Sequence, residues 1–119
     1  MDRQQRGKDA EDHAWHWLIK QGLKPVTRNY TCKLGEIDLI LYDKDTLVFT
    51  EVRLRKNKLF GGAANSVDYK KQQKLIRTAQ YFLMTHPSFQ HVNCRFDVIA
   101  FEISSEEMRP LWYKDAFRL

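Results

Sequence analysis

The chain has 119 residues, a net charge of +5, 43% hydrophobic and 29% charged residues. This length fits one domain over residues 1–119, and the composition excludes disordered, collagen-like and disulfide-rich proteins. No apolar run approaches the roughly 20 residues that cross a bilayer, and the first residues lack the apolar segment of a secretion signal, so we expect a cytoplasmic protein with no membrane partner.

The first predicted element is an amphipathic helix over about residues 7–21. Ala10, Ala14 and Leu18 recur at helical spacing, and Gly22 follows as a left-handed helix stop. Three strands are then predicted from their β-branched and aromatic residues and from the turn residues between them. They cover about residues 26–30, 36–42 and 46–54, and the last two form a hairpin.

The second half of the chain predicts a loop, a helix and one or two strands. Residues 56–65 have no periodicity and predict a loop, after which Ser66 is expected to cap a helix that ends near Thr85. Residues 94–103 alternate as a fourth strand, and residues 111–113 add a short edge strand. The order αβββαβ(β) predicts a single-domain α/β sandwich with a central mixed β-sheet flanked by helices.

Positive charge is concentrated between Val52 and Arg77. This stretch has eight basic residues and one acid, Asp68, so the rest of the chain carries a slight excess of acid. Such a basic zone is typical of a polyanion-binding surface, because cations placed on phosphates release condensed counterions. Nucleic acid is the leading expected partner; on charge alone, a solvated helix face beside a soluble loop is the alternative. The basic residues are Arg53, Arg55, Lys56, Lys58, Lys70, Lys71, Lys74 and Arg77.

The hairpin turn predicts the register of its two strands. With the turn at residues 43–46, Tyr42 pairs with Leu47, and Asp38 then lies opposite Glu51. Because side chains alternate along a strand, the two carboxylates share one face of the hairpin. That face also carries Glu36, Ile40, Tyr42, Leu47, Phe49 and Arg53. The other face is wholly apolar and carries Ile37, Leu39, Leu41, Val48, Val52 and Leu54.

Asp38 and Glu51 are therefore a candidate metal site. Directly opposed carboxylates destabilise a sheet, and at an effective dielectric constant of about 20 their repulsion is roughly 3 kcal/mol. A bound Mg²⁺ or Mn²⁺ offsets this repulsion, because such ions prefer oxygen ligands and keep water for chemistry on phosphate. The alternative is a structural ion network in which Arg53 and a basic side chain of the second helix neutralise the pair.

Two further charged residues are expected near this pair. Glu11 borders the apolar stripe of the first helix and is a candidate third carboxylate, although a Glu in the first turns of a helix is often a solvated dipole partner. Lys71 lies between Val67 and Leu75 on the inward stripe of the second helix, where an ammonium group needs carboxylates or phosphates within reach. Extension of its long stem to solvent is the competing explanation.

The strings Gly-Glu-Ile-Asp-Leu-Ile at residues 35–40 and Glu-Val-Arg-Leu-Arg at residues 51–55 resemble the bacterial YraN family. Glycines 61–62 and segments 67–74 and 95–98 extend the resemblance over nearly the whole chain. That family is assigned to the restriction-endonuclease-like fold and is similar to Holliday-junction resolvases. The resemblance implies a metal-dependent nuclease site of the PD-(D/E)xK kind. Resolvases of this fold usually work as two-fold dimers, which leaves a homodimer open.

The resemblance also implies roles for individual residues. Asp38 matches the first metal-binding Asp of the pattern, Glu51 matches the acidic residue of the ExK element, and Glu11 matches a helix-one glutamate of resolvase-like members. Arg53 stands at the lysine position, which is a departure, because arginine stays protonated and cannot act as a general base, although it can hold a phosphate. Lys71 is a candidate to take the role of the missing lysine.

The leading hypothesis is a Mg²⁺-dependent phosphodiesterase that acts on DNA, including branched or structured DNA. Asp38 and Glu51 bind the metal, Glu11 supports it, and Lys71 and Arg53 contact the scissile phosphate. Further backbone contacts are expected from Arg55, Lys56, Lys58, Lys70 and Lys74. A noncatalytic nucleic-acid-binding protein that keeps the fold is the second hypothesis, and a subunit whose basic zone binds an acidic protein partner is the third.

Overall fold

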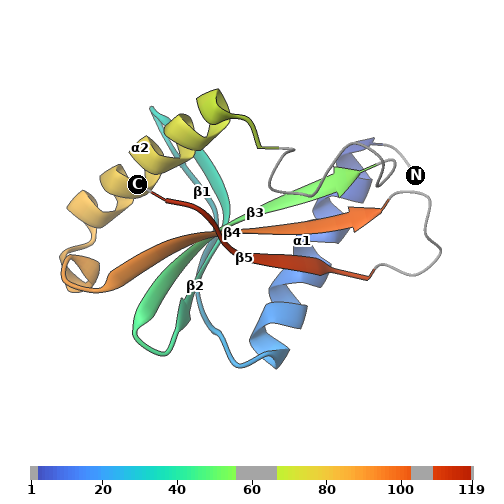
Figure 1. Ribbon diagram of the computed structural model, residues 1–119, viewed down its shortest axis with the longest axis horizontal. Coiled ribbons are helices and arrows are strands. Elements are labelled where there is room, and N and C mark those ends of the chain that lie inside the picture. Colours follow the sequence, from blue (N-terminus) through green and yellow to red (C-terminus); the bar gives the residue numbers. More distant parts are fainter. Residues whose placement is uncertain (1–2, 56–66, 103–108, 119) are drawn as a thin grey trace.

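A computed structural model of the protein describes residues 3–55, 67–102 and 109–118. Figure 1 shows the helices and strands found in these ranges. In chain order they are α1 (Arg3–Lys20), β1 (Lys24–Cys32), β2 (Gly35–Asp43), β3 (Thr46–Arg55), α2 (Tyr69–Thr85), the 3-10 turn η3 (Pro87–Phe89), β4 (Asn93–Glu102) and β5 (Leu111–Phe117).

The five strands form one mixed sheet in the order β1-β2-β3-β4-β5. β3 and β4 are parallel, and every other neighbouring pair is antiparallel. Parallel neighbours need a crossover connection, and α2 lies in the connection between β3 and β4. The predicted α/β architecture with a mixed sheet is confirmed, and it is consistent with a restriction-endonuclease-like fold. Within the described ranges, neither helix has the length and apolar character needed to cross a membrane.

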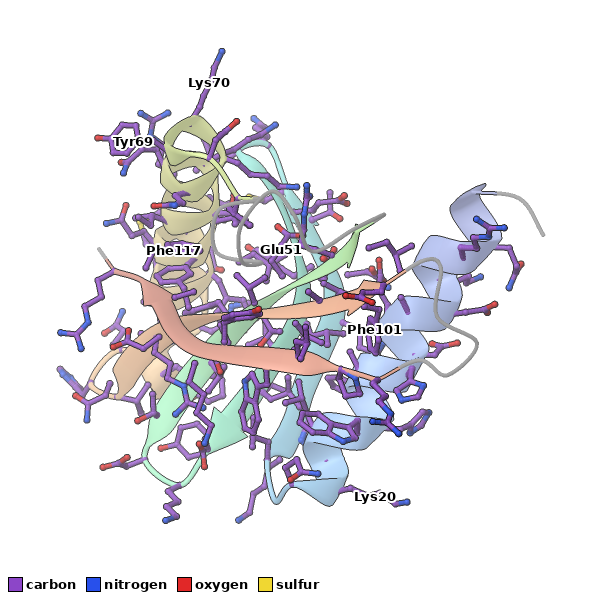
Figure 2. The ribbon with its side chains drawn as sticks, turned by 45° about the vertical axis from the view of Figure 1, so that its right-hand side comes forward. Lys20, Glu51, Tyr69, Lys70, Phe101 and Phe117 are labelled. Atoms are coloured by element: carbon purple, nitrogen blue, oxygen red, sulfur yellow. The ribbon has the colours of Figure 1, made fainter. Side chains whose placement is uncertain are left out.

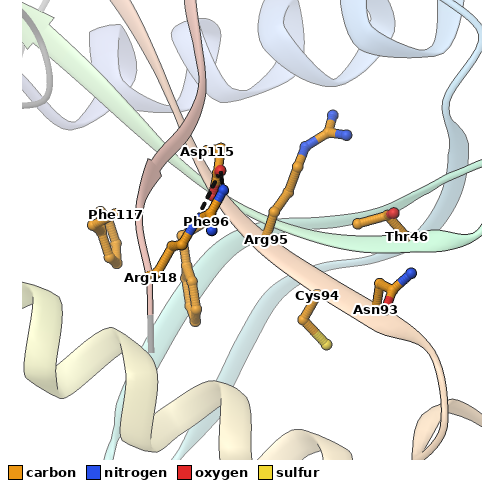
Figure 3. A pocket seen from close by; sticks show the side chains of 8 residues that line it. All are labelled: Thr46, Asn93, Cys94, Arg95, Phe96, Asp115, Phe117 and Arg118. Atoms are coloured by element: carbon orange, nitrogen blue, oxygen red, sulfur yellow. Dashed lines mark hydrogen bonds and ion pairs between the residues drawn. The ribbon is translucent and has the colours of Figure 1, made fainter.

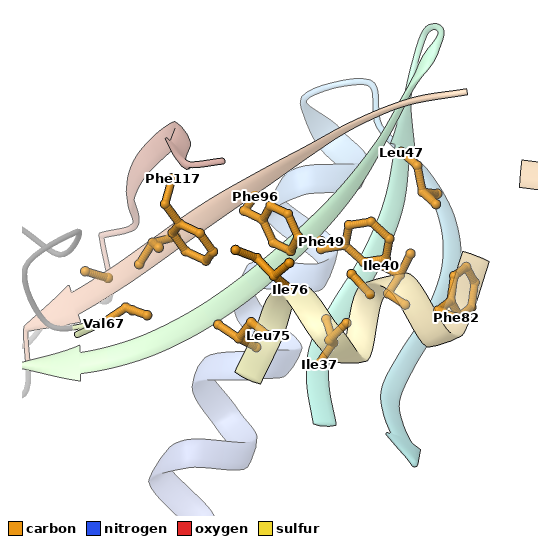
Figure 4. Close-up of a cluster of buried hydrophobic side chains, with 13 residues drawn as sticks. Ile37, Ile40, Leu47, Phe49, Val67, Leu75, Ile76, Phe82, Phe96 and Phe117 are labelled. Carbon is orange, nitrogen blue, oxygen red and sulfur yellow. The ribbon is translucent and has the colours of Figure 1, made fainter. Parts of the chain in front are cut away.

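The two helices cover opposite faces of the sheet, and each face has its own apolar core. Ala10, Ala14 and Leu18 of α1 pack on one face. That face of the sheet supplies Leu39, Leu41, Val48, Ile99 and Phe101. Figure 4 shows the second cluster, where α2 packs through Leu75, Ile76, Ala79 and Phe82 onto Ile40, Leu47, Phe49, Phe96 and Val98. Burial of apolar surface on both faces fixes the position of the central strands β3 and β4.

The boundaries of several elements differ from the sequence prediction, and β1 is longer than predicted at both ends. α1 begins at Arg3 rather than near residue 7, because the preceding polar residues are good helix formers that carry no apolar stripe. The N-cap of α2 is Asp68 rather than Ser66, and its Oδ1 accepts a hydrogen bond from the Lys71 N–H at 2.8 Å. The edge strand β5 is longer than predicted. The predicted helix stop at Gly22 is confirmed, with a φ of 104°.

The predicted hairpin register is confirmed from Tyr42↔Leu47 to Leu39↔Thr50. One prediction about its faces is wrong, because Ile37 packs in the cluster under α2 instead of on the α1 face. The pairing of β1 with β2 places Asn29 opposite position 38, and Asn29 has a φ of 51°. A left-handed residue in a strand increases its twist, which breaks the side-chain alternation here.

Arg95 and Asp97 on β4 form a buried polar network. Asp97 is only 1% exposed, and its carboxylate accepts hydrogen bonds from Arg95 Nε at 3.0 Å, Trp112 Nε1 at 2.9 Å and the Asp115 N–H at 2.9 Å. Arg95 also pairs with Asp43, with Nη2 and Oδ2 3.0 Å apart. These contacts tie the edge strand β5 to β4 and to the hairpin turn.

Replacement of Asp97 by Asn is expected to lower the free energy of unfolding by about 2 kcal/mol, because an amide turns one acceptor into a donor and leaves buried donors unsatisfied. Chemical denaturation measures this change. Asp115→Asn is the matched control. The Asp115 side chain pairs with the exposed Arg118 at the surface, so this substitution is expected to lower the free energy of unfolding less than Asp97→Asn does. Equal stability of Asp97→Asn and the parent protein would contradict the structural role of the network.

Candidate functional site

Asp38 lies where β2 and β3 separate. The paired register of these strands ends at Leu39 and Thr50. One residue further, Asp38 Oδ2 accepts a hydrogen bond from the Val52 N–H at 2.8 Å. The carboxylate therefore replaces a backbone carbonyl as the partner of β3, and this bond holds the side chain between the two strands.

Glu51 is the most strongly perturbed acid in the described part of the chain. Its side chain lies on the sheet next to α2 (Figure 2), and the residue is only 8% exposed. Burial, a side-chain hydrogen bond with Asp38 and the negative charge of Asp38 raise the pKa of Glu51 from 4.5 to about 9. At neutral pH the Glu51 carboxyl is therefore protonated and donates its proton toward Asp38.

Two cations lie beside this carboxyl pair. Lys71 Nζ is 3.8 Å from Glu51 Oε2, and the Lys71 side chain is 40% exposed. The charges of Lys71 and Arg53 both act to lower the pKa of Glu51, but burial and Asp38 outweigh them. Lys71 and Arg53 therefore do not keep Glu51 ionised, and the two carboxyl groups share one proton. The structural ion network stays the alternative interpretation of this pair.

A small cleft of about 180 Å³ opens at Glu51 between the sheet and the first turns of α2. Its lining combines two acids, two lysines and one apolar residue, namely Glu36, Glu51, Lys71, Lys74 and Leu75. Adjacent anionic and cationic walls suit a phosphate group bound together with a cation. The cap formed by Asp68 fixes the turn that carries Lys71, so local helix formation positions the cationic wall.

Glu11 approaches the pair from α1, on the other side of the sheet. Burial raises the pKa of Glu11, and the negative charge of Asp38 adds to this effect, whereas Arg28 opposes it. Glu11 and Asp38 are therefore electrostatically coupled, and the role of Glu11 as a third carboxylate of a metal site stays a prediction. Within the described residues, no group of three or more His, Cys, Asp or Glu side chains is arranged to hold a metal ion.

The other predicted contact residues divide into two sets. Lys74 lines the cleft, whereas Lys70 is exposed on the outer side of α2. Lys56, Lys58 and the side chain of Arg55 lie outside the described residues. Glu36 was not predicted as a site residue, although its position on the same predicted face as Asp38 was a usable signal.

A larger hollow of about 430 Å³ lies where β4 begins and β5 ends (Figure 3). Its lining residues are Thr46, Asn93, Cys94, Arg95, Phe96, Asp115, Phe117 and Arg118. Both of its arginines are paired with acids, Arg95 with Asp97 and Asp43 and Arg118 with Asp115. Because these charges are already matched, the smaller cleft is the better candidate for chemistry despite its size.

Comparison with known proteins gives one family. The family described as "Uncharacterised protein family UPF0102" matches residues 10–101, a range that contains every residue of the cleft. A UPF0102 protein of Alcanivorax borkumensis is 53% identical over 112 residues, which are 93% of this chain and 90% of that protein. A UPF0102 protein of Pseudomonas syringae pv. syringae is 47% identical over 116 residues, 97% of this chain and 94% of that protein.

Proposed function

The chain belongs to the UPF0102 family, which is the YraN family that its sequence resembles, and from its geometry we propose that it is a metal-dependent phosphodiesterase acting on DNA. The observation that carries this proposal is the contact between the carboxyl groups of Asp38 and Glu51, with Lys71 Nζ 3.8 Å from Glu51. Paired carboxylates beside a cation are the groups that a nuclease needs to hold a metal ion and a phosphate together.

The donor set fits Mg²⁺ or Mn²⁺. Asp38 and Glu51 would hold the ion, because carboxylate oxygens are the ligands that these ions prefer and the ion would replace the proton that the pair shares. A bound ion of this kind lowers the pKa of a coordinated water and neutralises charge that develops on the phosphate. Glu11 would accept a hydrogen bond from a water at this site, and its raised pKa makes it a stronger proton acceptor than an ordinary glutamate.

The basic residues of the cleft would hold the substrate. Lys71 and Lys74 line the cleft beside Glu51, where their ammonium groups can bind the oxygens of a phosphate. Arg53 would add a planar guanidinium group that can donate two hydrogen bonds to one phosphate. Because arginine cannot act as a general base, Arg53 would orient and stabilise the phosphate rather than activate the nucleophile. Lys71 would contact the same phosphate and is the candidate for the role of the missing lysine.

The direct test is cleavage of labelled linear, flap and four-way-junction DNA with Mg²⁺, with Mn²⁺ or with EDTA. Strand breaks that require the divalent ion would support the proposal. No cleavage of any substrate with either ion, by protein that binds DNA and unfolds cooperatively, would refute it. RNA versions of the same substrates determine whether the activity is confined to DNA.

A divalent-ion titration gives a second prediction. At a concentration about ten times its Kd, Mn²⁺ is expected to stabilise the protein by about 1.4 kcal/mol, which raises the Tm by roughly 3–6 °C. The increase should be larger at about pH 8 than at about pH 6, because the ion must displace the proton held by Glu51. Thermal denaturation with Mn²⁺, with EDTA and with K⁺ at equal ionic strength measures the effect. An equal response of Glu51→Gln would contradict binding at this pair.

One observation favours a second candidate function. Arg53 occupies the position at which the nuclease pattern has a lysine, so the fold could bind nucleic acid without hydrolysing it. This alternative predicts binding that weakens steeply with salt, needs no divalent ion and is unchanged in Glu51→Gln. Such binding in the absence of any cleavage would select the noncatalytic function.

A further inference from the structure

One stripe of α2 faces solvent and continues away from the cleft. Its members recur at intervals of three and four residues, which places them on one side of the helix. From position 70 to position 81 the stripe is about 16 Å long, at about 1.5 Å per residue. We call it the α2 ridge, and its residues are Lys70, Lys74, Arg77, Tyr81 and Met84.

The α2 ridge is positively charged without compensation from its own helix. α2 contains no Asp or Glu, and within the described residues Lys70, Lys74 and Arg77 form no ion pair with an acid. Lys74 belongs both to the ridge and to the lining of the cleft. A row of cations that leads to the candidate site is complementary to the backbone of a polyanion.

Large apolar groups accompany these cations. Tyr69, at the first position of α2, is 74% exposed, and Tyr81 is 39% exposed. Figure 2 shows Tyr69 beside Lys70 at the end of the helix, away from the body of the protein. Within the described residues the Tyr69 ring has no aromatic partner. The Asp68 cap fixes the backbone at this position, so the exposed ring has a defined place.

We propose that the α2 ridge, together with Tyr69 beside its first residue, binds a single-stranded segment of polynucleotide, with phosphates on Lys70, Lys74 and Arg77 and bases stacked on Tyr69 and Tyr81. Every base presents an aromatic face, so cations interleaved with exposed aromatic rings bind single strands without reading sequence. In a duplex the bases are stacked on one another, and the two tyrosines have nothing to stack on. This proposal rests on the proposed function, because the nucleic-acid strand is directed toward the cleft only if the cleft is the site of cleavage. The substrate class is then nucleic acid with an unpaired arm rather than a continuous duplex.

The experiment measures binding in EDTA, so that its outcome does not depend on cleavage. Fluorescence anisotropy compares a labelled single-stranded oligonucleotide, its duplex and the corresponding RNA strand. The parent protein is expected to bind the single strand more tightly than the duplex. Tyr69→Ala and Tyr81→Ala are each expected to weaken single-strand binding by at least about fivefold, whereas Tyr69→Phe keeps the affinity. Duplex binding should change little in all three variants.

Charge variants distinguish the stacking of bases on the tyrosines from the electrostatic attraction of phosphates to the lysines. Lys70→Gln is expected to lower the slope of log K against log salt by about 0.7 for a single strand. Lys20→Gln is the matched control, because Lys20 is an exposed lysine of α1 at the opposite end of the protein (Figure 2). Equal affinity for single strand and duplex, or tyrosine variants that bind like the parent, would overturn the proposal. Equally tight binding of poly-glutamate, unaffected by Tyr69→Ala, would also overturn it and assign the ridge to an acidic protein.

Discussion

Asp38→Asn and Glu51→Gln are each expected to slow divalent-ion-dependent cleavage of DNA by about a thousandfold. The reason is that a metal ion supplies several kcal/mol of charge stabilisation to the transition state, and each 1.4 kcal/mol is a factor of ten in rate. Both substitutions keep the size of the side chain and remove the anionic oxygen that would hold the ion. Asp38→Asn can still accept the hydrogen bond from the Val52 N–H through its amide oxygen.

Glu36→Gln is the matched control for these variants. Glu36 lines the same cleft but is exposed, so Glu36→Gln is expected to change the cleavage rate by less than about tenfold. The assay compares initial rates of strand cleavage by all four proteins, prepared identically, with thermal denaturation to verify folding. Equal rates for the parent, Asp38→Asn and Glu51→Gln would identify the cleavage as a contaminant and refute the assignment of the pair.

Glu51→Gln is also expected to change how the free energy of unfolding depends on pH. In the unfolded chain Glu51 loses its proton near its ordinary pKa of 4.5, whereas in the folded protein burial and Asp38 hold the pKa near 9. Between these values the folded state binds more protons than the unfolded state, so the stability from this group is present below about pH 4.5 and is lost as the pH rises toward about 9. Glutamine does not titrate, so the variant lacks this loss.

The difference in unfolding free energy between Glu51→Gln and the parent should therefore grow in favour of the variant by up to about 1.4 kcal/mol for each pH unit within this window. Denaturant unfolding without divalent ions at about pH 5, 7 and 9 measures the slope. The opposite slope, with the parent gaining stability as the pH rises, would mean that the 3.8 Å pair with Lys71 dominates over burial and Asp38. That outcome would indicate an ionised Glu51 in a complete ion pair with Lys71 and would favour the structural ion network over a metal site.

The apolar pattern and the turn residues predicted most of the local structure. The hairpin shows why: the turn residues and the alternation of Leu39, Leu41 and Val48 specify a register that the structure confirms. The helix ends were less predictable. Ser66 and Asp68 both have side chains that can cap α2, and only the hydrogen bond to Lys71 selects Asp68.

The candidate site was predicted as a group of residues but not as an arrangement in space. The sequence brings Asp38 and Glu51 near each other through a single local hairpin, so this proximity could be predicted without knowledge of distant contacts. The difference in burial and hydrogen bonding between the two carboxyl groups could not be predicted in this way. Glu51 is buried because α2 packs over β3. Asp38 accepts the hydrogen bond of the Val52 N–H because the pairing of β2 with β3 ends at Leu39, on the side away from the hairpin turn.

The sequence by itself therefore determined the order of the elements, the hairpin register and the pairing of two carboxylates, because each depends on interactions between residues close together in the chain. Only the tertiary structure decided that Glu51 holds a proton, that Glu11 couples to Asp38 from the opposite helix, and that Lys74 joins the cleft to the α2 ridge. Burial and electrostatic coupling depend on which distant surfaces pack together, and periodicity along a chain carries no information about that.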